Sequence, residues 1–473
     1  MTRILYKIIL LSITLLSLSC SCSNDNDSYT PVDKITYEEG EELLIGQFSI
    51  GSQSNNAFGH KIPGLIDNEG AFETGNSLFN QSWVSSPAST TARDGLGPTF
   101  NAKACASCHF KDGRGRPPLA GDTGESNGFL MRISIPGESM NGGPLEVPHY
   151  GDQIQDHANL NIPAEAKVLI TYETVKGNYP DGTPYELRKP VYAIQNEEFG
   201  SLQTVLTSPR IAQQTIGLGF IDALDDAAIL ANVDEFDTDK DGISGKANYV
   251  WDVKTNTLKI GKFGWKSNQP SLEQQIAGAF NGDMGLTTYL FPENNCPSPQ
   301  NDCANAPNGG APEVTDRQLK HVLIYQAALA VPTRRDYKKE NVLKGKNLFR
   351  ELACIKCHVD NFVTDNNYAI LPQIQNIQVR PYSDFLLHDM GEKLADNRPD
   401  FLASGREWRT QPLWGIGLIE TVNNHTFLLH DGRARNIEEA ILWHGGEAEK
   451  SKNDFMQLTQ AERQYLLDFI NSL

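Results

Sequence analysis

Two copies of one five-residue motif constrain this chain more than any other feature. Residues 105–109 and 354–358 both read C-x-x-C-H, the spacing at which two thiols one helical turn apart bond the two vinyl groups of a porphyrin. The histidine after each pair is then placed under the iron as its proximal ligand. We therefore expect two covalently bound haem c groups. The expected attachment residues and proximal ligands are Cys105, Cys108, His109, Cys354, Cys357 and His358.

A thiol pair can also form a disulfide, a buried pair or half of a zinc site. The two motifs take four of the eight cysteines and lie about 250 residues apart in the sequence. A single structural zinc is usually held by ligand pairs that lie much closer together. The repetition of the complete motif, histidine included, therefore favours haem.

The first 19 residues have the pattern of a signal peptide. Arg3 and Lys7 precede an apolar run from 8 to 18, which is shorter than the roughly 20 residues of a membrane-spanning helix. Cys20 follows as it does in a bacterial lipoprotein signal, so we expect lipidation at Cys20. Cys22 is a competing site, and an ordinary cleaved signal is the alternative.

Residues 20–39 are polar and rich in turn formers, which is typical of a flexible tether. The signal and the haem motifs together predict a lipid-anchored protein of the cell envelope of a Gram-negative-type bacterium. It would lie in the periplasm or on the outer-membrane surface. The formal net charge of −18 disfavours nucleic acid as a partner and favours a basic redox carrier.

A faint internal repeat precedes both motifs. Residues 75–79 and 345–349 read G-x-x-L-F, and Cys354 follows the second copy by five residues, whereas Cys105 follows the first by 26. The second copy resembles the opening helix of a class I cytochrome c. We therefore expect a mainly α fold with two class I cytochrome c-like domains, 40–335 and 336–473. Strand-like segments between 120 and 230 predict a β-containing insertion in the first domain.

Further candidate ligands lie outside the two motifs. His149 and His157 could reach the first iron, and Arg114 and Arg116 could pair with haem propionates. Otherwise each of these side chains is an ordinary surface or hydrogen-bonded residue.

Residues 237–244 have the spacing of a calcium loop, with possible ligands at Asp237, Asp239 and Asp241. Position 12 is Asn248 rather than glutamate, so an acidic surface turn is the alternative. Cys296 and Cys303 remain as a close pair, for which a disulfide is the simplest expectation in an oxidising compartment.

Over residues 40–473 the sequence resembles the bacterial di-haem oxidoreductase family, whose members are described as peroxidases and also carry a thiol oxidoreductase label. It is more distantly similar to the di-haem cytochrome c peroxidases and to the di-haem enzyme that matures methylamine dehydrogenase. The stretches that carry the resemblance are 94–102, 239–245, 263–266, 388–391 and 430–447.

The resemblance implies ligands beyond the two motifs. In the distant relatives an H-D-G motif precedes a helix that bears the sixth ligand of the C-terminal haem, and the equivalent residue here is His444, fourteen residues after His430. Met390 and His388 are alternatives. Thr410, Pro412 and Asn101 fall where the relatives bind an inter-haem calcium ion.

The resemblance also implies a path for electrons. They would pass from a donor cytochrome to the C-terminal haem, and then to a catalytic N-terminal haem that reduces hydrogen peroxide. One of Trp265, Trp414 and Trp443 could assist the transfer, and Glu69, Glu73 and Asp94 are candidates for the acid/base that peroxide cleavage needs. The alternatives are an electron-transfer cytochrome without substrate chemistry and a redox accessory to periplasmic iron uptake.

Overall fold

Two helix pairs of the same design frame the two haem motifs. The computed structural model describes residues 36–67, 69–119 and 127–473, so the expected signal peptide, Cys20 and Cys22 lie outside the described residues. Helix α1 (Ala71–Asn80) packs on α7 (Asp316–Ala327), and α8 (Glu340–Glu351) packs on α12 (Gln460–Ser472). Each pair places the G-x-x-L-F repeat directly against its partner helix.

The glycine of each repeat is needed because the helices touch there. A Cβ atom on Gly75 would overlap with the carbonyl oxygen of His321, and one on Gly345 would overlap with that of Tyr465. Four residues on, Phe79 lies 6.1 Å from the His109 ring and Phe349 lies 6.1 Å from the His358 ring, measured between ring centroids. The repeat is therefore one structural unit used twice.

The partner helices begin with the same cap. The Thr315 hydroxyl accepts a hydrogen bond from the Gln318 amide, and Thr459 does the same for Glu462, with the reciprocal side-chain bond in both cases. This capping box satisfies backbone donors that a helix start leaves unpaired. The expected domain boundary at 335/336 falls between α7 and α8 and stays a prediction, as does the assignment of these units to class I cytochrome c.

The expectation of a mainly α fold is wrong. Helices take 27% of the residues and strands 19%, in several small sheets. The reason lies in the insertion, where β-branched and aromatic residues alternate with polar ones over long stretches and so favour extended backbone. The largest element is an antiparallel hairpin of β6 (Lys167–Asn178) and β7 (Pro184–Gln195).

The remaining elements are mostly short. The other helices are α2 (Cys105–Cys108), α3 (Leu218–Asp222), α4 (Asp226–Leu230), α5 (Leu272–Met284), α6 (Asn301–Ala304), α9 (Ile419–Asn423), α10 (Ile437–Trp443) and α11 (Glu449–Gln457). The other strands are β1 (Leu44–Gln47), β2 (Thr99–Phe100), β3 (Phe129–Glu138), β4 (Pro144–Leu145), β5 (His157–Ala158), β8 (Leu206–Ile211), β9 (Tyr249–Asp252), β10 (Thr257–Ile260), β11 (Phe362–Val363), β12 (Gln378–Val379), β13 (Leu387–Asp389) and β14 (Glu407–Arg409). Strand β3 pairs with β4 on one side and β8 on the other.

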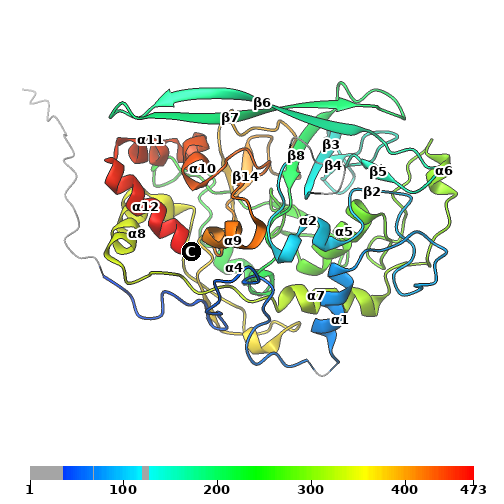
Figure 1. The fold of residues 1–473 in the computed structure, drawn as a ribbon, viewed down its shortest axis with the longest axis horizontal. Coiled ribbons are helices and arrows are strands. Elements are labelled where there is room, and N and C mark those ends of the chain that lie inside the picture. Colours follow the sequence, from blue (N-terminus) through cyan, green and yellow to red (C-terminus); the bar gives the residue numbers. More distant parts are fainter. Residues whose placement is uncertain (1–35, 68, 120–126) are drawn as a thin grey trace, which may run out of the picture. The chain divides into compact units, whose positions relative to one another are not determined.

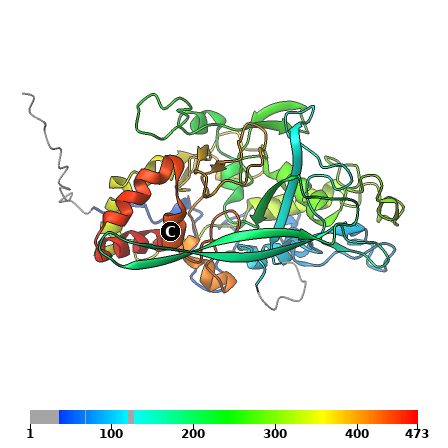
Figure 2. The same ribbon diagram turned by 90° about the horizontal axis from the view of Figure 1, so that it is seen from above.

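The β6–β7 hairpin extends from the strands of the insertion to the C-terminal helices (Figure 1). The view from above shows the same course (Figure 2). Near its tip the Tyr179 hydroxyl donates to Glu438 of α10 at 2.6 Å, and Arg463 of α12 pairs with Asp181 at 2.8 Å. Residues 35–473 form one compact unit. Among the described residues no helix is long and apolar enough to cross a membrane.

Candidate haem cavities

The first motif opens onto an internal cavity of about 390 Å³, here called the first cavity. Cys105, Cys108 and His109 line it, and neither cysteine forms a disulfide. The Nδ1–H of His109 donates to the carbonyl oxygen of Gln213 at 2.6 Å. This hydrogen bond fixes the ring, and the other ring nitrogen, Nε2, remains available as a metal ligand.

The second motif opens onto a cavity of about 210 Å³, here called the second cavity. Cys354, Cys357 and His358 line it, and again neither cysteine forms a disulfide. The Nδ1–H of His358 donates to the carbonyl oxygen of Tyr382 at 2.9 Å. Burial lowers the pKa of His358 to about 4, so its imidazole is neutral at neutral pH, as metal binding requires.

His444 lines the same second cavity as His358. It follows the last residue of α10, whose start is capped by Asn436 at 2.8 Å from the Glu439 amide nitrogen. The His444 Nδ1–H donates to the carbonyl oxygen of Ala440 at 2.6 Å, and burial lowers the pKa of the ring. His358 and His444 therefore face one cavity with available Nε2 atoms, and His430, whose Nε2 also has no hydrogen-bond partner, lines the same cavity.

The alternatives to His444 have different surroundings. Both ring nitrogens of His388 are engaged, Nε2 with Asp384 at 2.8 Å and Nδ1 with Glu447 at 2.7 Å, so His388 has no nitrogen to spare for iron. Met390 also lines the second cavity and keeps its place as an alternative ligand.

The first cavity contains no second histidine among the described residues that line it. His149 is exposed and its Nδ1–H donates to the Ser298 carbonyl at 2.5 Å, while His157 stacks on Phe100 and pairs with Asp156 at 2.8 Å. Met284, the last residue of α5, does line this cavity. Its thioether sulfur is therefore a candidate second ligand in the first cavity. No motif in the sequence pointed to Met284.

Three carboxylates line the first cavity: Glu146, Asp152 and Asp283. Asp152 forms an ion pair with Arg132 and Asp283 accepts from the Gln153 amide at 2.9 Å. Glu146 forms no hydrogen bond or ion pair with another described residue. Its partial burial, and after that the charge of Asp152, raise its pKa.

None of the three acid/base candidates chosen from the sequence lines either cavity. Glu73 pairs with Lys61 and Glu69 with Lys320 on the surface. The Asp94 carboxylate lies 3.5 Å from the Ala88 amide nitrogen. Glu146 follows the short strand β4 and belongs to no recognisable motif, so nothing in the local sequence distinguishes it.

The two cavities share part of their walls. Trp265 and Gln214 line both, and the Trp265 indole N–H donates to the carbonyl oxygen of Ile211 at 2.9 Å. Trp414 and Trp443 are buried but line neither cavity. Of the three tryptophans considered from the sequence, Trp265 alone stands between the cavities in the described part of the chain.

The second cavity carries polar atoms that suit the propionate groups of a haem. Arg114, Arg409 and His430 line it, and each has one buried side-chain nitrogen without a hydrogen-bond partner: Nε in both arginines and Nε2 in the histidine. Buried polar groups without partners are costly. An anionic group in this cavity would satisfy all three, so the donor set fits a haem.

The candidate calcium residues lie at the surface near the second motif. Carboxylate oxygens of Asp234, Asp237 and Asp239 lie within 4.8 Å of one another. Asp241 instead pairs with the Lys356 ammonium at 2.9 Å. Calcium binding by this loop stays a prediction.

Two candidates for an inter-haem calcium ion, Thr410 and Pro412, line the second cavity, and Asn101 does not. This calcium site stays a prediction. The Asn101 amide donates to the Ile154 carbonyl at 2.9 Å and to Asp156 at 2.9 Å. These hydrogen bonds use both amide hydrogens of Asn101 within the first half of the chain.

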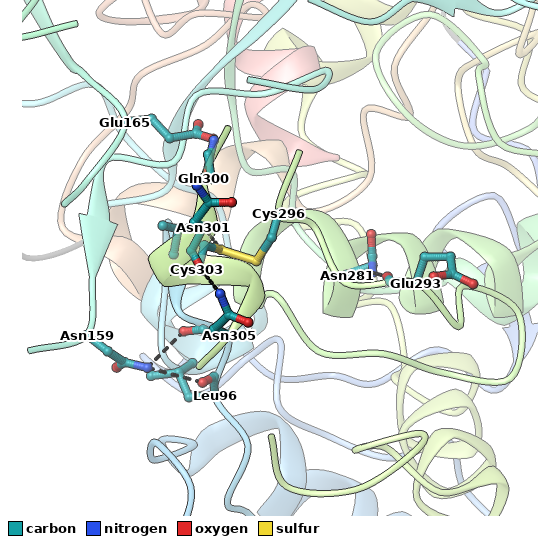
Figure 3. The surroundings of a disulfide bond; sticks show 12 residues. Leu96, Asn159, Glu165, Asn281, Glu293, Cys296, Gln300, Asn301, Cys303 and Asn305 are labelled. Atoms are coloured by element: carbon teal, nitrogen blue, oxygen red, sulfur yellow. Dashed lines mark hydrogen bonds between the residues drawn. A yellow bond between two sulfur atoms is a disulfide. The ribbon is translucent and has the colours of Figure 1, made fainter. Parts of the chain in front are cut away.

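Cys296 and Cys303 are joined in a disulfide that closes a loop after α5 (Figure 3). Above the bond in this view, the Gln300 amide donates to the Glu165 carboxylate at 2.6 Å, and the Gln155 backbone amide donates to the same carboxylate at 2.7 Å. Burial raises the pKa of Glu165 to about 8.

Comparison with known proteins agrees with this pair of cavities. No curated protein matches the chain. A family model described as "Di-haem oxidoreductase, putative peroxidase" matches residues 44–473, which is nearly the whole chain and includes both motifs and both cavities. The chain therefore belongs to the di-haem oxidoreductase family.

Proposed function

We propose that this protein is a di-haem c-type peroxidase that reduces hydrogen peroxide at the first cavity with electrons received at the second. The overall reaction is H2O2 + 2 e⁻ + 2 H⁺ → 2 H2O. The observation that carries the proposal is the difference between the cavities. The second is lined by His358 and His444, with His430 as a third imidazole that we assign to a haem propionate, whereas one imidazole lines the first.

The chain's own thiols and imidazoles would hold the two groups. Cys105 and Cys108 would bond the first haem and Cys354 and Cys357 the second, with His109 and His358 as proximal ligands. When bound, the haem irons supply one-electron redox chemistry and, at an open axial position, a place for peroxide.

His444 gives the second cavity its role. With His358 it would occupy both axial positions, so that no substrate can bind. An imidazole in place of methionine also lowers the reduction potential of a haem. The second cavity then serves electron entry, with Arg114 and Arg409 holding the propionates.

Glu146 gives the first cavity its acid/base. Its carboxylate would take the proton from one peroxide oxygen and return it to the other oxygen as the O–O bond breaks. The raised pKa of Glu146 suits this exchange, because proton transfer is most efficient when the pKa lies near the working pH. Asp152 and Asp283 are held by Arg132 and Gln153 and are less free to move a proton.

Trp265 and Gln214 both line both cavities and so stand in the wall between them. We place electron transfer between the haems through this wall. The donor would be a carrier with a basic face, because the chain has a formal net charge of −18. Export, haem attachment and a lipid anchor at Cys20 would place the protein in the cell envelope.

Met284 supports a second candidate function. Its side chain lines the first cavity, so it could act as a second strong ligand there. Both irons would then be six-coordinate, and the protein would be an electron-transfer cytochrome without substrate chemistry.

Electron paramagnetic resonance of the haem-loaded, half-reduced protein tests the proposal. We expect a ferric high-spin signal from the haem at Cys105 and Cys108 that changes when hydrogen peroxide is added. A wholly low-spin spectrum that does not respond to peroxide would refute the peroxidase and favour the Met284-ligated cytochrome. The variant Met284→Leu then decides, since it would convert that low-spin signal to high-spin.

A further inference from the structure

We propose that a surface hollow beside the disulfide loop is the substrate entrance of the first cavity, and that it admits small uncharged hydroperoxides while excluding bulky or anionic ones. This inference rests on the proposed function, because it names the substrate class of the same site. The hollow has a volume of about 370 Å³. It is lined by the loop 290–297 together with Glu146, Gly151 and Asn281.

The hollow and the first cavity have four lining residues in common. Glu146, Asn281, Phe291 and Asn295 line both. Because the same four side chains line both spaces, they form the wall that separates the hollow from the first haem site. Glu146, the proposed acid/base, therefore stands where an incoming molecule must pass.

The boundary is held in place from both sides. The Asn281 side chain on α5 donates to the backbone carbonyl of Glu293 at 3.0 Å (Figure 3), and the Thr288 amide donates to the Phe291 carbonyl at 3.0 Å. Beyond the loop, the Cys296–Cys303 disulfide closes the chain onto itself. The entrance therefore has a defined width in the folded protein.

Phe291 determines that width. Its ring packs over Gly278 of α5, where a Cβ atom would lie 3.8 Å from the ring. The ring belongs to the wall of both the hollow and the first cavity. A molecule the size of hydrogen peroxide can pass beside a half-buried aromatic ring, whereas an aryl hydroperoxide has to displace it.

Charge at the entrance acts against anions. Two carboxylates, Glu146 and Glu293, line the hollow, and the described residues that line it include no lysine or arginine. On the inner side, the Arg132 guanidinium is already paired with Asp152. An anion would meet like charge at the mouth without a free cation behind it, whereas an uncharged peroxide meets no such barrier.

Ligand-binding kinetics of the haem-loaded ferric protein test the entrance without relying on peroxidase activity. The size probes are cyanide, which enters as neutral HCN at pH 7, and 4-phenylimidazole. We expect Phe291→Ala to raise the association rate of 4-phenylimidazole at the first haem about tenfold, equivalent to roughly 1.4 kcal/mol of barrier, and to leave that of cyanide nearly unchanged. Phe291→Leu, which keeps more of the packing, should give a smaller change in the same direction, and the exposed Phe236→Ala should give none.

Azide is the charge probe. We expect Glu293→Lys, a substitution in the hollow only, to raise the association rate of azide and to leave that of cyanide unchanged. Turnover with hydrogen peroxide and with cumene hydroperoxide supplies the matching activity comparison. There Phe291→Ala should improve the bulky substrate relative to the small one.

The outcomes separate the entrance from the proposed function. Unchanged 4-phenylimidazole and azide rates in these variants, with normal peroxide turnover in the wild type, would overturn the entrance and leave the peroxidase standing. Altered probe rates without any peroxide turnover would support the entrance and refute the peroxidase. If no exogenous ligand binds at the first haem, both proposals fail.

Discussion

The two cavities share one frame and differ in their walls. In both, a helix bearing G-x-x-L-F crosses a capped helix and brings a phenylalanine to the proximal histidine. The second cavity is completed by helices, and α10 ends at His444. The first is lined by helix α5, which carries Asp283 and Met284, and by strands and loops of the insertion, with Arg132 on β3, Arg210 on β8 and Glu146 after β4. We therefore expect any difference in chemistry between the two cavities to come from residues outside the motifs.

Removal of one haem is the most severe test of this division. We expect the double variant Cys354→Ser with Cys357→Ser to carry one covalent haem by mass spectrometry and to lose steady-state turnover with a reduced cytochrome donor, because electrons no longer enter at the second cavity. The mirror variant Cys105→Ser with Cys108→Ser should keep a low-spin haem that accepts electrons but does not react with peroxide. Full donor-dependent turnover in the Cys354→Ser, Cys357→Ser variant would mean that electrons do not have to enter at the second haem.

Substitution of the acid/base tests the first cavity alone. We expect Glu146→Gln to lower kcat/KM for hydrogen peroxide by about 10²–10⁴ and to leave the low-spin signal of the second haem unchanged. In the wild type the rate should fall as the pH falls through the raised pKa of Glu146, because the proton acceptor is lost. The pH–rate profile of Glu146→Gln should lack this fall at low pH. Glu293→Gln is the control, and an equal loss of activity in it would argue against a proton-transfer role for Glu146.

The second cavity has a matching test at His444. We expect His444→Ala to convert the second haem from low-spin to high-spin and to make it bind cyanide, because one of two axial imidazoles is removed. Met390→Leu should retain the low-spin spectrum. The reverse result, with Met390→Leu high-spin and His444→Ala unchanged, would assign the sixth ligand to Met390. Optical and paramagnetic spectra of the ferric variants give the answer.

The shared frame is tested by the two repeat glycines. We expect Gly75→Ala and Gly345→Ala each to lower the free energy of unfolding by about 1–3 kcal/mol, since the new methyl group is forced into a tightly packed crossing. Gly278→Ala on α5, where a Cβ atom meets nothing closer than 3.8 Å, should instead raise it by up to about 1 kcal/mol. Urea unfolding of the haem-loaded variants measures all three. A large loss at only one of the two repeat glycines would show that the helix pairs are not equivalent.

The chemistry of the chain was easier to predict from its sequence than its fold. The two C-x-x-C-H motifs could be found because their residues lie at a fixed spacing, whereas His444 was chosen by resemblance and stays a prediction as a ligand. The mainly α expectation failed because segments recognised as strand-like extend into β6 and β7 of twelve residues each. Glu146 could not be found at all, since its neighbours Cys105 and Phe291 are distant in sequence and the cavity is formed only by folding. Trp265 was one of three equal candidates until its place in both walls distinguished it.

The position of the motif thiols has a consequence for how the protein is made. All four line the two cavities, and burial raises the pKa of Cys105 and of Cys354 to about 12. A reactive thiolate is therefore scarce at Cys105 and Cys354 in the folded chain. If haem is attached covalently at these thiols, as we propose, attachment therefore has to precede folding. Polypeptide that folds before it receives haem would then stay without its prosthetic groups.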